Sequence, residues 1–136
     1  MYHEDDKKIV GQTVKKIFKN DAKDKIAFIL KESKAVILVA EGDCCSTSWF
    51  ESFNDLDVLI GRKVVEIVNR DMPQPLGENP DDCIAVYGTT FVTNRGRADL
   101  EMRNQSNGYY GGYITVQEMT EEEAVVQCPI EVKSEF

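Results

Sequence analysis

The sequence predicts a single α+β domain, residues 1–136, made mostly of antiparallel β-sheet with two short helices. Short runs rich in valine and isoleucine, in which apolar and polar residues alternate, recur along the chain and are typical of strands. The links between the first of these runs are short, which favours antiparallel neighbours. A length of 136 residues falls in the range of one domain and can bury a core without a metal or a disulfide.

Three consecutive strands are predicted near the N-terminus, at Thr13–Phe18, Lys25–Leu30 and Ala35–Ala40. Short polar bends separate them, so we expect an antiparallel meander. The second and third strands carry apolar residues on both faces. We therefore expect these two strands to be central in their sheet and covered on each side.

The best-marked helix begins at Asn54, which can cap the free amides of a first turn. Asp57 follows three residues later, where a carboxylate favours a helix N-terminus, and Phe53 and Val58 can form a hydrophobic staple. Gly61 can end the helix. The sequence thus predicts a short helix between Asn54 and Gly61.

The segment around Gly11 matches the segment around Gly61. Each has an apolar residue just before the glycine and further apolar residues three and six positions after it. Each pattern indicates a helix end, a glycine cap and a strand start. The match predicts a second short helix at Glu4–Val10 and a strand at Lys63–Val68, in a helix–strand unit that occurs twice.

The last third of the chain is again predicted as strands. We expect Cys83–Val92 as a strand broken near Gly88, then Arg97–Asn104 and Tyr113–Met119. The second of these alternates cleanly, and its inward residues are Ala98, Leu100 and Met102. The tail, residues 119–136, is acidic and contains Pro129; an edge strand and a loose tail are both compatible with it.

The formal net charge is −8 and it is distributed unevenly. Residues 1–40 carry nine lysines and six acidic residues, whereas residues 41–136 carry seven basic and eighteen acidic residues. A field of this sign repels phosphate, so direct nucleic-acid binding is not expected. The longest apolar runs are far too short to cross a membrane, and we expect a protein of the cytosol of a bacterial host.

No catalytic or metal-binding set stands out in the sequence. A nucleophilic cysteine or serine needs a nearby base, and the one histidine, His3, lies close to a terminus. Adjacent Cys44 and Cys45 face opposite sides of extended backbone, and with Cys83 and Cys128 they lack the ligand spacing of a zinc site. We predict no enzyme activity, no metal and no cofactor.

Two uncharged aromatic loops are the candidate site, CCSTSWF at residues 44–50 and SNGYYGGY at residues 106–113. Glycine lets a ligand approach backbone amides, and tyrosine and tryptophan offer flat faces for stacking. The structural alternative, which the sequence favours over binding, is a hairpin turn at Asn107-Gly108 with tyrosines packed over a sheet edge. The candidate contact residues are Cys44, Cys45, Trp49, Arg103, Asn107, Tyr109 and Tyr110.

The motifs GDCCS at 42–46 and SNGYY at 106–110, with Arg103, the Leu56–Ile67 segment and Ile9–Gly11, resemble a family of small bacteriophage and bacterial proteins. That family is one of domains of unknown function. The resemblance implies a small non-catalytic accessory protein that acts on host machinery, including inhibitors of antiviral defence that mask a protein or sequester a nucleotide signal.

The leading hypothesis is therefore a non-enzymatic phage-type binding protein that antagonises a host defence or regulatory component. Its acidic surface favours a host protein as the target, and its aromatic loops favour a small nucleotide-like ligand; we lean towards the protein. The alternative is a small thiol-dependent hydrolase or redox protein that uses Cys44 or Cys45. Exposed loops and a free edge strand are also compatible with a homo-oligomer.

Overall fold

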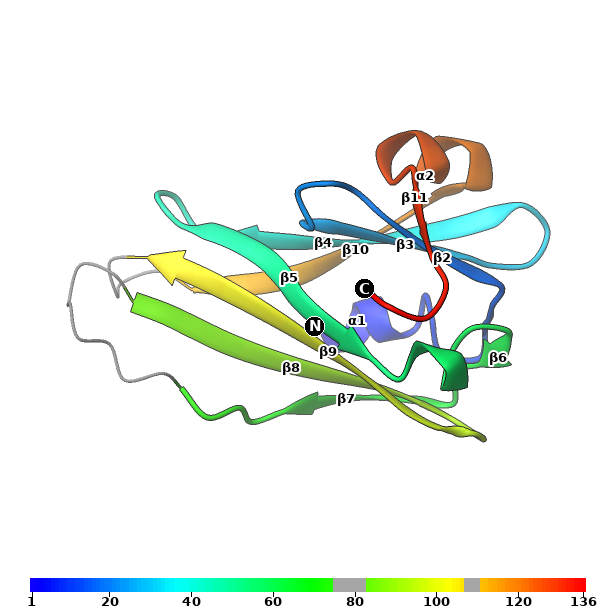
Figure 1. Ribbon diagram of the computed structural model, residues 1–136, viewed down its shortest axis with the longest axis horizontal. Coiled ribbons are helices and arrows are strands. Elements are labelled where there is room, and N and C mark those ends of the chain that lie inside the picture. Colours follow the sequence, from blue (N-terminus) through cyan, green and yellow to red (C-terminus); the bar gives the residue numbers. More distant parts are fainter. Residues whose placement is uncertain (75–82, 107–110) are drawn as a thin grey trace.

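The computed structural model describes residues 1–74, 83–106 and 111–136, and it consists of two antiparallel sheets packed face to face (Figure 1). The first sheet has the order β10–β4–β3–β2–β11, with β2 at Lys16–Lys19, β3 at Lys25–Ile29, β4 at Lys34–Gly42, β10 at Gly112–Thr120 and β11 at Ile130–Val132. The second has the order β5–β9–β8–β7, with β5 at Thr47–Asn54, β7 at Glu66–Arg70, β8 at Cys83–Thr93 and β9 at Gly96–Ser106. A separate pair joins β1, Thr13–Val14, to β6, Arg62–Lys63.

Helices account for little of the described chain. The α-helices are α1, His3–Asp6, and α2, Glu121–Gln127, and a single 3₁₀ turn, η1, spans Leu56–Val58. Figure 1 shows α2 lying on the outer side of the first sheet. The fold is therefore mostly β in one small domain, and the expected α+β class fits it only loosely.

The predicted meander is present, and β3 and β4 are central in the first sheet. Their inner residues, among them Phe28, join the core between the sheets. The Phe28 ring packs edge-on against Phe91 of the second sheet, with centroids 5.3 Å apart. On their outer side, Ala27 and Ile37 pack against α2 through Ala124. Apolar residues on both faces of these strands thus cover two cores, as the sequence predicted.

The two matching glycine segments pair with each other. Gly11 and Gly61 both have positive φ angles, 88° and 81°. The Gly11 amide donates to the Val64 carbonyl (2.8 Å), and the Gly61 amide donates to the Val14 carbonyl (2.6 Å). Because each glycine sits just before one of the two short strands, β1 and β6 form an antiparallel pair with equivalent partners.

This equivalence extends through the chain, because strands β1–β5 and β6–β10 follow the same course. In each half, the second, third and fourth strands form an antiparallel meander. The fifth strand of each half leaves its own meander and pairs with the fourth strand of the other half, β5 with β9 and β10 with β4. The fold is a two-fold pseudo-symmetric unit with exchanged fifth strands.

The exchange of the fifth strands shows that the hairpin interpretation of residues 106–113 is wrong. A hairpin would pair the strands on its two sides, but β9 and β10 lie in different sheets. The segment therefore connects one sheet to the other, as residues 43–46 do between β4 and β5. At the left of Figure 1 the β4–β5 turn, the end of β9 and the start of β10 come together.

The helix predicted from Asn54 to Gly61 is wrong in extent and in its cap. Asn54 is the last residue of β5 and pairs with Asp99 of β9. Asp55 follows with a left-handed φ of 62° and makes no side-chain cap hydrogen bond. Cross-strand pairing thus holds Asn54 extended, and only the single 3₁₀ turn remains before Gly61.

Three of the predicted strands also differ from those observed in their continuity. Predicted Thr13–Phe18 is divided at Lys15 into β1 and β2, and predicted Lys63–Val68 is divided likewise into β6 and β7. Strand β8 runs unbroken through Gly88. A Cβ at Gly88 would lie 2.7 Å from the Met72 sulfur and 3.0 Å from Arg70 Cζ, so the glycine serves close packing rather than a strand break.

The acidic tail holds a helix and an edge strand. Thr120 caps α2, because its hydroxyl oxygen accepts from the Glu123 amide at 3.2 Å. Strand β11 then pairs with β2 at the edge of the first sheet. The edge strand was one of the two alternatives for this segment, whereas α2 was not foreseen.

Candidate functional site

The first candidate loop is a tight turn at the end of β4. Within it the Ser46 amide donates to the Asp43 carbonyl at 3.1 Å, and the Ser46 hydroxyl donates to the same oxygen at 2.6 Å. Cys44 and Cys45 occupy the two corner positions, and both are exposed. The Asp43 amide donates to the Gly111 carbonyl at 3.2 Å, which joins this turn to the residue just before β10.

A buried amide holds the two crossing strands together behind this turn. Asn104 of β9 has no exposed surface, and its Nδ2 donates to Ser46 Oγ (3.1 Å) and Ser48 Oγ (2.8 Å). The Ser48 hydroxyl donates in turn to the Glu41 carbonyl at 2.8 Å. Both amide hydrogens are therefore used, and Asn104 Oδ1 is buried without a hydrogen-bond partner in the described part of the chain.

Two glycines allow this close crossing. Gly42 and Gly112 are paired across β4 and β10. A Cβ on Gly112 would lie 2.8 Å from Ser48 Oγ and 2.9 Å from Asn104 Cβ. A Cβ on Gly42 would meet Ser46 Oγ, and it would lie 2.6 Å from Asn104 Nδ2. We call Gly42, Ser46, Ser48, Asn104 and Gly112 the crossing cluster; it joins the β4–β5 turn to β9 and to the start of β10.

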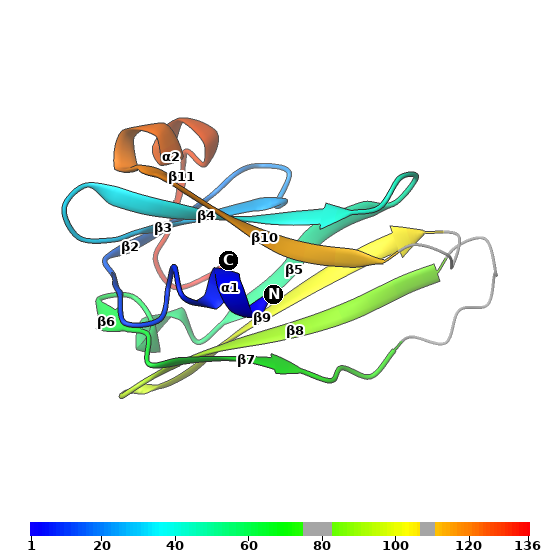
Figure 2. The ribbon, with the colours of Figure 1, turned by 180° about the vertical axis from the view of Figure 1, so that it is seen from behind.

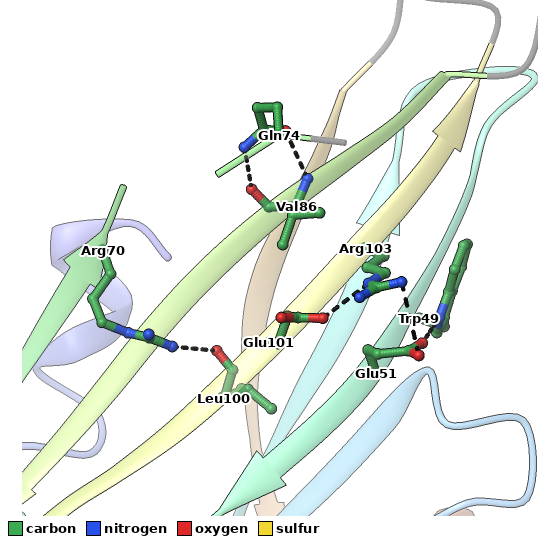
Figure 3. Close-up of polar contacts among 8 residues, drawn as sticks. All are labelled: Trp49, Glu51, Arg70, Gln74, Val86, Leu100, Glu101 and Arg103. Atoms are coloured by element: carbon green, nitrogen blue, oxygen red, sulfur yellow. Dashed lines mark hydrogen bonds and ion pairs between the residues drawn. The ribbon is translucent and has the colours of Figure 1, made fainter. Parts of the chain in front are cut away.

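Trp49 and Arg103 lie next to this base on the outer face of the second sheet. They are direct cross-strand partners, since Trp49 of β5 pairs with Arg103 of β9. The Trp49 indole N–H donates to Glu51 Oε2 at 2.6 Å, and Arg103 Nε donates to Glu101 Oε2 at 2.8 Å. Figure 3 shows the four side chains on neighbouring strands, and we call them the Trp49–Arg103 cluster.

Glu51 contacts both key side chains of this cluster. Its Oε1 lies 3.9 Å from Arg103 Nη1, while its other oxygen accepts from Trp49. The β5–β9 register shifts between Phe50 and Ser52, so Glu51 sits at a bulge. A bulge re-aims a side chain, and here the carboxylate reaches both neighbours. Glu51 thereby restrains the orientation of the Trp49 ring and of the Arg103 guanidinium.

The charge of this cluster favours some ligands over others. One guanidinium faces two carboxylates, and the Arg103 side chain is 36% exposed. Its positive charge is therefore already compensated by Glu51 and Glu101, which leaves an excess of one negative charge. A phosphate would meet repulsion here, whereas a basic or neutral protein surface would not.

The structure brings four of the seven predicted contact residues to one end of the fold. Cys44 and Cys45 form the corner of the turn, and Trp49 and Arg103 lie on the adjoining outer face. Asn107, Tyr109 and Tyr110 lie outside the described residues. Sequence reasoning missed the crossing cluster and the acidic partners of Arg103, because these depend on which strands pair.

The cysteines of the turn have no catalytic partner in the described residues. Their Sγ atoms lie 3.2 Å apart in a hydrogen bond, which raises the pKa of the Cys44 thiol. His3 lies in α1, near the N-terminus and far in sequence from these two cysteines. Within 1–74, 83–106 and 111–136, no group of three or more metal-binding side chains is arranged to hold a metal ion.

A cleft that the sequence did not indicate opens between β8 and the start of β10. Its volume is about 550 Å³, and its aromatic lining is Tyr2, Tyr87 and Tyr113. The Tyr2 and Tyr113 rings are 6.2 Å apart, and the Tyr87 hydroxyl oxygen accepts from the Gly112 amide at 3.1 Å. This volume lies in the range of small-molecule sites.

The wall of the cleft is tied to the second sheet by polar side chains. Gln74 makes both hydrogen bonds that a neighbouring strand would make to Val86: its Nε2 donates to the carbonyl and its Oε1 accepts from the amide, each at 2.9 Å (Figure 3). Arg70 Nη2 donates to the Leu100 carbonyl at 3.5 Å, and its Nε lies 3.6 Å from Asp99 Oδ1. Residues from five separate parts of the described chain line this cleft, so no local motif marks it.

In Figure 2 the molecule is seen from behind, with α1 and the N-terminus lying beside β10 and β8. The lining of the cleft includes Met1 and Tyr2 from this N-terminal segment. The Met1 amino group donates to Asn69 Oδ1 at 3.2 Å, and the Asn69 amide donates back to the Met1 carbonyl at 3.0 Å.

None of the described helices is long and apolar enough to span a bilayer.

Comparisons with known proteins give a family and one relative. A family described as "Domain of unknown function (DUF7448)" matches residues 7–116, which include β1–β9 and the first part of β10. The chain is also similar to "Uncharacterized protein L278" of Acanthamoeba polyphaga mimivirus, with 32% identity over 113 residues, 79% of this chain and 88% of that protein. No solved structure matches the chain.

Proposed function

The chain belongs to the DUF7448 family of domains of unknown function, and we propose that it is a non-enzymatic, viral-type binding protein that masks a protein target. The Trp49–Arg103 cluster is its proposed contact surface, together with the adjoining turn at Cys44 and Cys45. The observation that carries the proposal is that one carboxylate, Glu51, holds both Trp49 and Arg103 in place on an exposed face.

Tryptophan and arginine are the side chains most enriched among the dominant contacts of protein interfaces. Their value depends on order before binding, because immobilising a free side chain costs affinity. Here the Trp49 indole donates to Glu51 at 2.6 Å and the Arg103 guanidinium donates to Glu101 at 2.8 Å, so both are restrained before binding. Binding would then bury a surface that is largely preorganised.

The charge of the site supports a target surface that is neutral or basic. The cluster has two carboxylates and one guanidinium, in a chain whose formal net charge is −8. Charge complementarity steers association and excludes wrong partners. The relative from a mimivirus supports a viral-type accessory role, and the target we propose is a host defence or regulatory component.

The test is affinity capture from a host-cell lysate with matched variants. The wild-type chain should retain one protein in stoichiometric amount, and Trp49→Ala should weaken its affinity about 30-fold or more, the effect of a dominant contact. Val126→Ala is the control. Val126 is 78% exposed and lies on α2, which covers the first sheet, whereas Trp49 lies on the second. Retention that is equal for all three chains would refute the proposed surface.

Tyr109 and Tyr110, which lie outside the described residues, can be tested in the same capture experiment. Replacing both Tyr109 and Tyr110 by alanine should remove binding while the free energy of unfolding changes by less than about 1 kcal/mol, as for ordinary surface substitutions. A larger loss of stability would mean that the two tyrosines support the fold rather than the contact.

A second candidate function is sequestration of a small planar ligand, such as a nucleotide-like molecule. The observation that favours it is the cleft with its three tyrosines and nearby Arg70. The two candidates separate when the purified protein is denatured and its released small molecules are identified by mass. A stoichiometric ligand whose binding survives Trp49→Ala but not Tyr113→Ala would replace the protein-masking proposal.

A further inference from the structure

The corner of the β4–β5 turn brings two adjacent thiols into contact. Successive side chains of extended backbone point to opposite faces, so neighbouring cysteines are ordinarily kept apart. In this turn the Sγ atoms of Cys44 and Cys45 lie 3.2 Å from each other. Both residues are exposed, so small molecules in solution can reach either sulfur.

The backbone of the turn is unusual at the second of these cysteines. Cys45 has a φ of 68°, in the left-handed region. It occupies the third position of the turn closed by the Ser46 amide and the Asp43 carbonyl, where a positive φ favours glycine or asparagine. Lys23, Glu32, Ser33 and Asp55 also have positive φ, so the meaning of this angle at Cys45 lies in the two sulfurs that it brings together. The conformation that strains Cys45 is also the one that holds the two sulfurs together.

We propose that Cys44 and Cys45 form a reversible dithiol–disulfide site that reacts with low-molecular-weight disulfides. A deprotonated thiol of the pair attacks one sulfur of the small disulfide, forms a mixed disulfide and releases one small thiolate. The neighbouring deprotonated thiol then attacks the protein sulfur of that mixed disulfide and expels the second small thiolate. The pair loses two protons and two electrons, and the small disulfide becomes two thiols.

Closing the bond requires only a local movement. The sulfurs must approach from 3.2 Å to about 2.0 Å, the length of a disulfide bond. The product is a ring of the two sulfurs, both Cβ and both Cα atoms and the intervening peptide carbon and nitrogen. So small a ring is strained, and strained exposed disulfides are the readily reduced ones. The site would therefore follow the redox state of its surroundings.

Cys128 shows the contrasting environment within the same chain. It has no exposed surface and packs against Ala124 beneath α2. Burial raises the pKa of its thiol to about 11. A buried thiol that stays protonated neither attacks nor is attacked. We therefore expect reactivity toward small disulfides at the exposed turn and not at Cys128.

The proposal does not depend on the proposed protein target. The turn is joined to Gly111 by the hydrogen bond from the Asp43 amide to the Gly111 carbonyl, and the protein-binding proposal rests on Trp49 and Arg103 rather than on the two thiols. The chemistry itself can be measured on the purified chain without any partner. Failure of one proposal therefore leaves the other standing.

The experiment incubates the full chain with graded mixtures of reduced and oxidised glutathione, quenches with acid, alkylates and measures masses. Trypsin cleavage after Lys34 and Arg62 releases one peptide that carries both cysteines and no other. As oxidised glutathione increases, this peptide should lose the mass of two hydrogen atoms and gain no glutathione. Dithiothreitol should restore both alkylated thiols.

Single variants separate the internal bond from simple thiol exposure. Cys44→Ser and Cys45→Ser should each accumulate a mixed disulfide with one glutathione, because the resolving thiol is missing. Cys128→Ser should behave as the wild-type chain does. Wild-type protein that accumulates the glutathione adduct, or that stays fully reduced while the single variants react, would overturn the proposal.

Discussion

Replacing Asn104 by aspartate tests whether the crossing cluster holds the two loops to the sheets. The two side chains have nearly the same shape, so packing changes little while the two N–H donors disappear. The amide hydrogens go to Ser46 Oγ and Ser48 Oγ at 3.1 and 2.8 Å, in a site with no exposed surface. Each such bond contributes about 1 kcal/mol, and an unpaired buried group adds a desolvation cost.

The expected loss of unfolding free energy is therefore about 2–4 kcal/mol at neutral pH. In a domain of this size that lowers the melting temperature by roughly 3–4 °C per kcal/mol. Urea denaturation of the wild type, Asn104→Asp and Ser48→Ala measures the free energies, and the double variant gives the coupling between the two positions. Ser48→Ala alone should cost about 1–3 kcal/mol, because it leaves one amide hydrogen of the buried Asn104 without an acceptor.

The pH dependence of Asn104→Asp provides a second readout. Burial raises the pKa of the introduced carboxyl above its unfolded value of about 3.9. A group with a higher pKa in the folded than in the unfolded state stabilises the fold at pH values below the unfolded pKa. This stabilisation is lost as the pH rises through the folded pKa. The deficit against the wild type should thus be smaller at acidic than at neutral pH. A pH-independent deficit below about 0.5 kcal/mol would refute the role assigned to this amide.

Two further predictions concern stability. Gly112→Ala should cost about 1–3 kcal/mol without a change in the urea m value, because its Cβ would lie 2.8 Å from Ser48 Oγ; an unchanged urea midpoint would show that the strands can move apart. Burial raises the pKa of the Cys128 thiol from 9.0 to about 11, so the protonated thiol should stabilise the fold below pH 9. This stabilisation should be lost as the pH rises towards 11. Cys128→Ala should flatten that fall in denaturation curves measured at pH 8 and at pH 10.5, and a parallel fall in both proteins would contradict it.

The strands were predictable because their burial pattern is local. Ala98, Leu100 and Met102 alternate with charged residues along β9, and all three are buried as expected. Alternation does not say which strands pair. The exchange that sends β5 to β9 and β10 to β4 depends on contacts between distant segments, so it could not be predicted from one sequence.

The helices illustrate how local signals compete with pairing. At Asn54 a good capping pattern was present, but cross-strand pairing with Asp99 kept the residue extended. At Thr120 the sequence offers Thr-x-x-Glu, the capping-box signature, and the structure uses its threonine hydroxyl as the cap of α2. The run of acidic residues obscured that signal, although negative charge favours the first turn of a helix.

The candidate site was predictable as a set of loop residues and not as an arrangement. The chemistry of Cys44, Cys45, Trp49 and Arg103 marks them in the sequence, and the exchanged strands bring them to one end. The partners that give this end its character, Glu51 and Glu101, are ordinary acidic residues in the sequence. Their importance follows from the β5 bulge and from the β5–β9 register.

The most direct test of the proposed function is the affinity of a captured host protein for three purified chains. We predict that Trp49→Ala combined with Arg103→Ala weakens its dissociation constant at least about 30-fold, since both replaced side chains are of the type that dominates interfaces. Val126→Ala should bind as the wild type does, and all three chains should unfold at urea midpoints that keep them folded in the assay. Equal dissociation constants for the double variant and the wild type would contradict the central claim that this preorganised cluster is the binding surface.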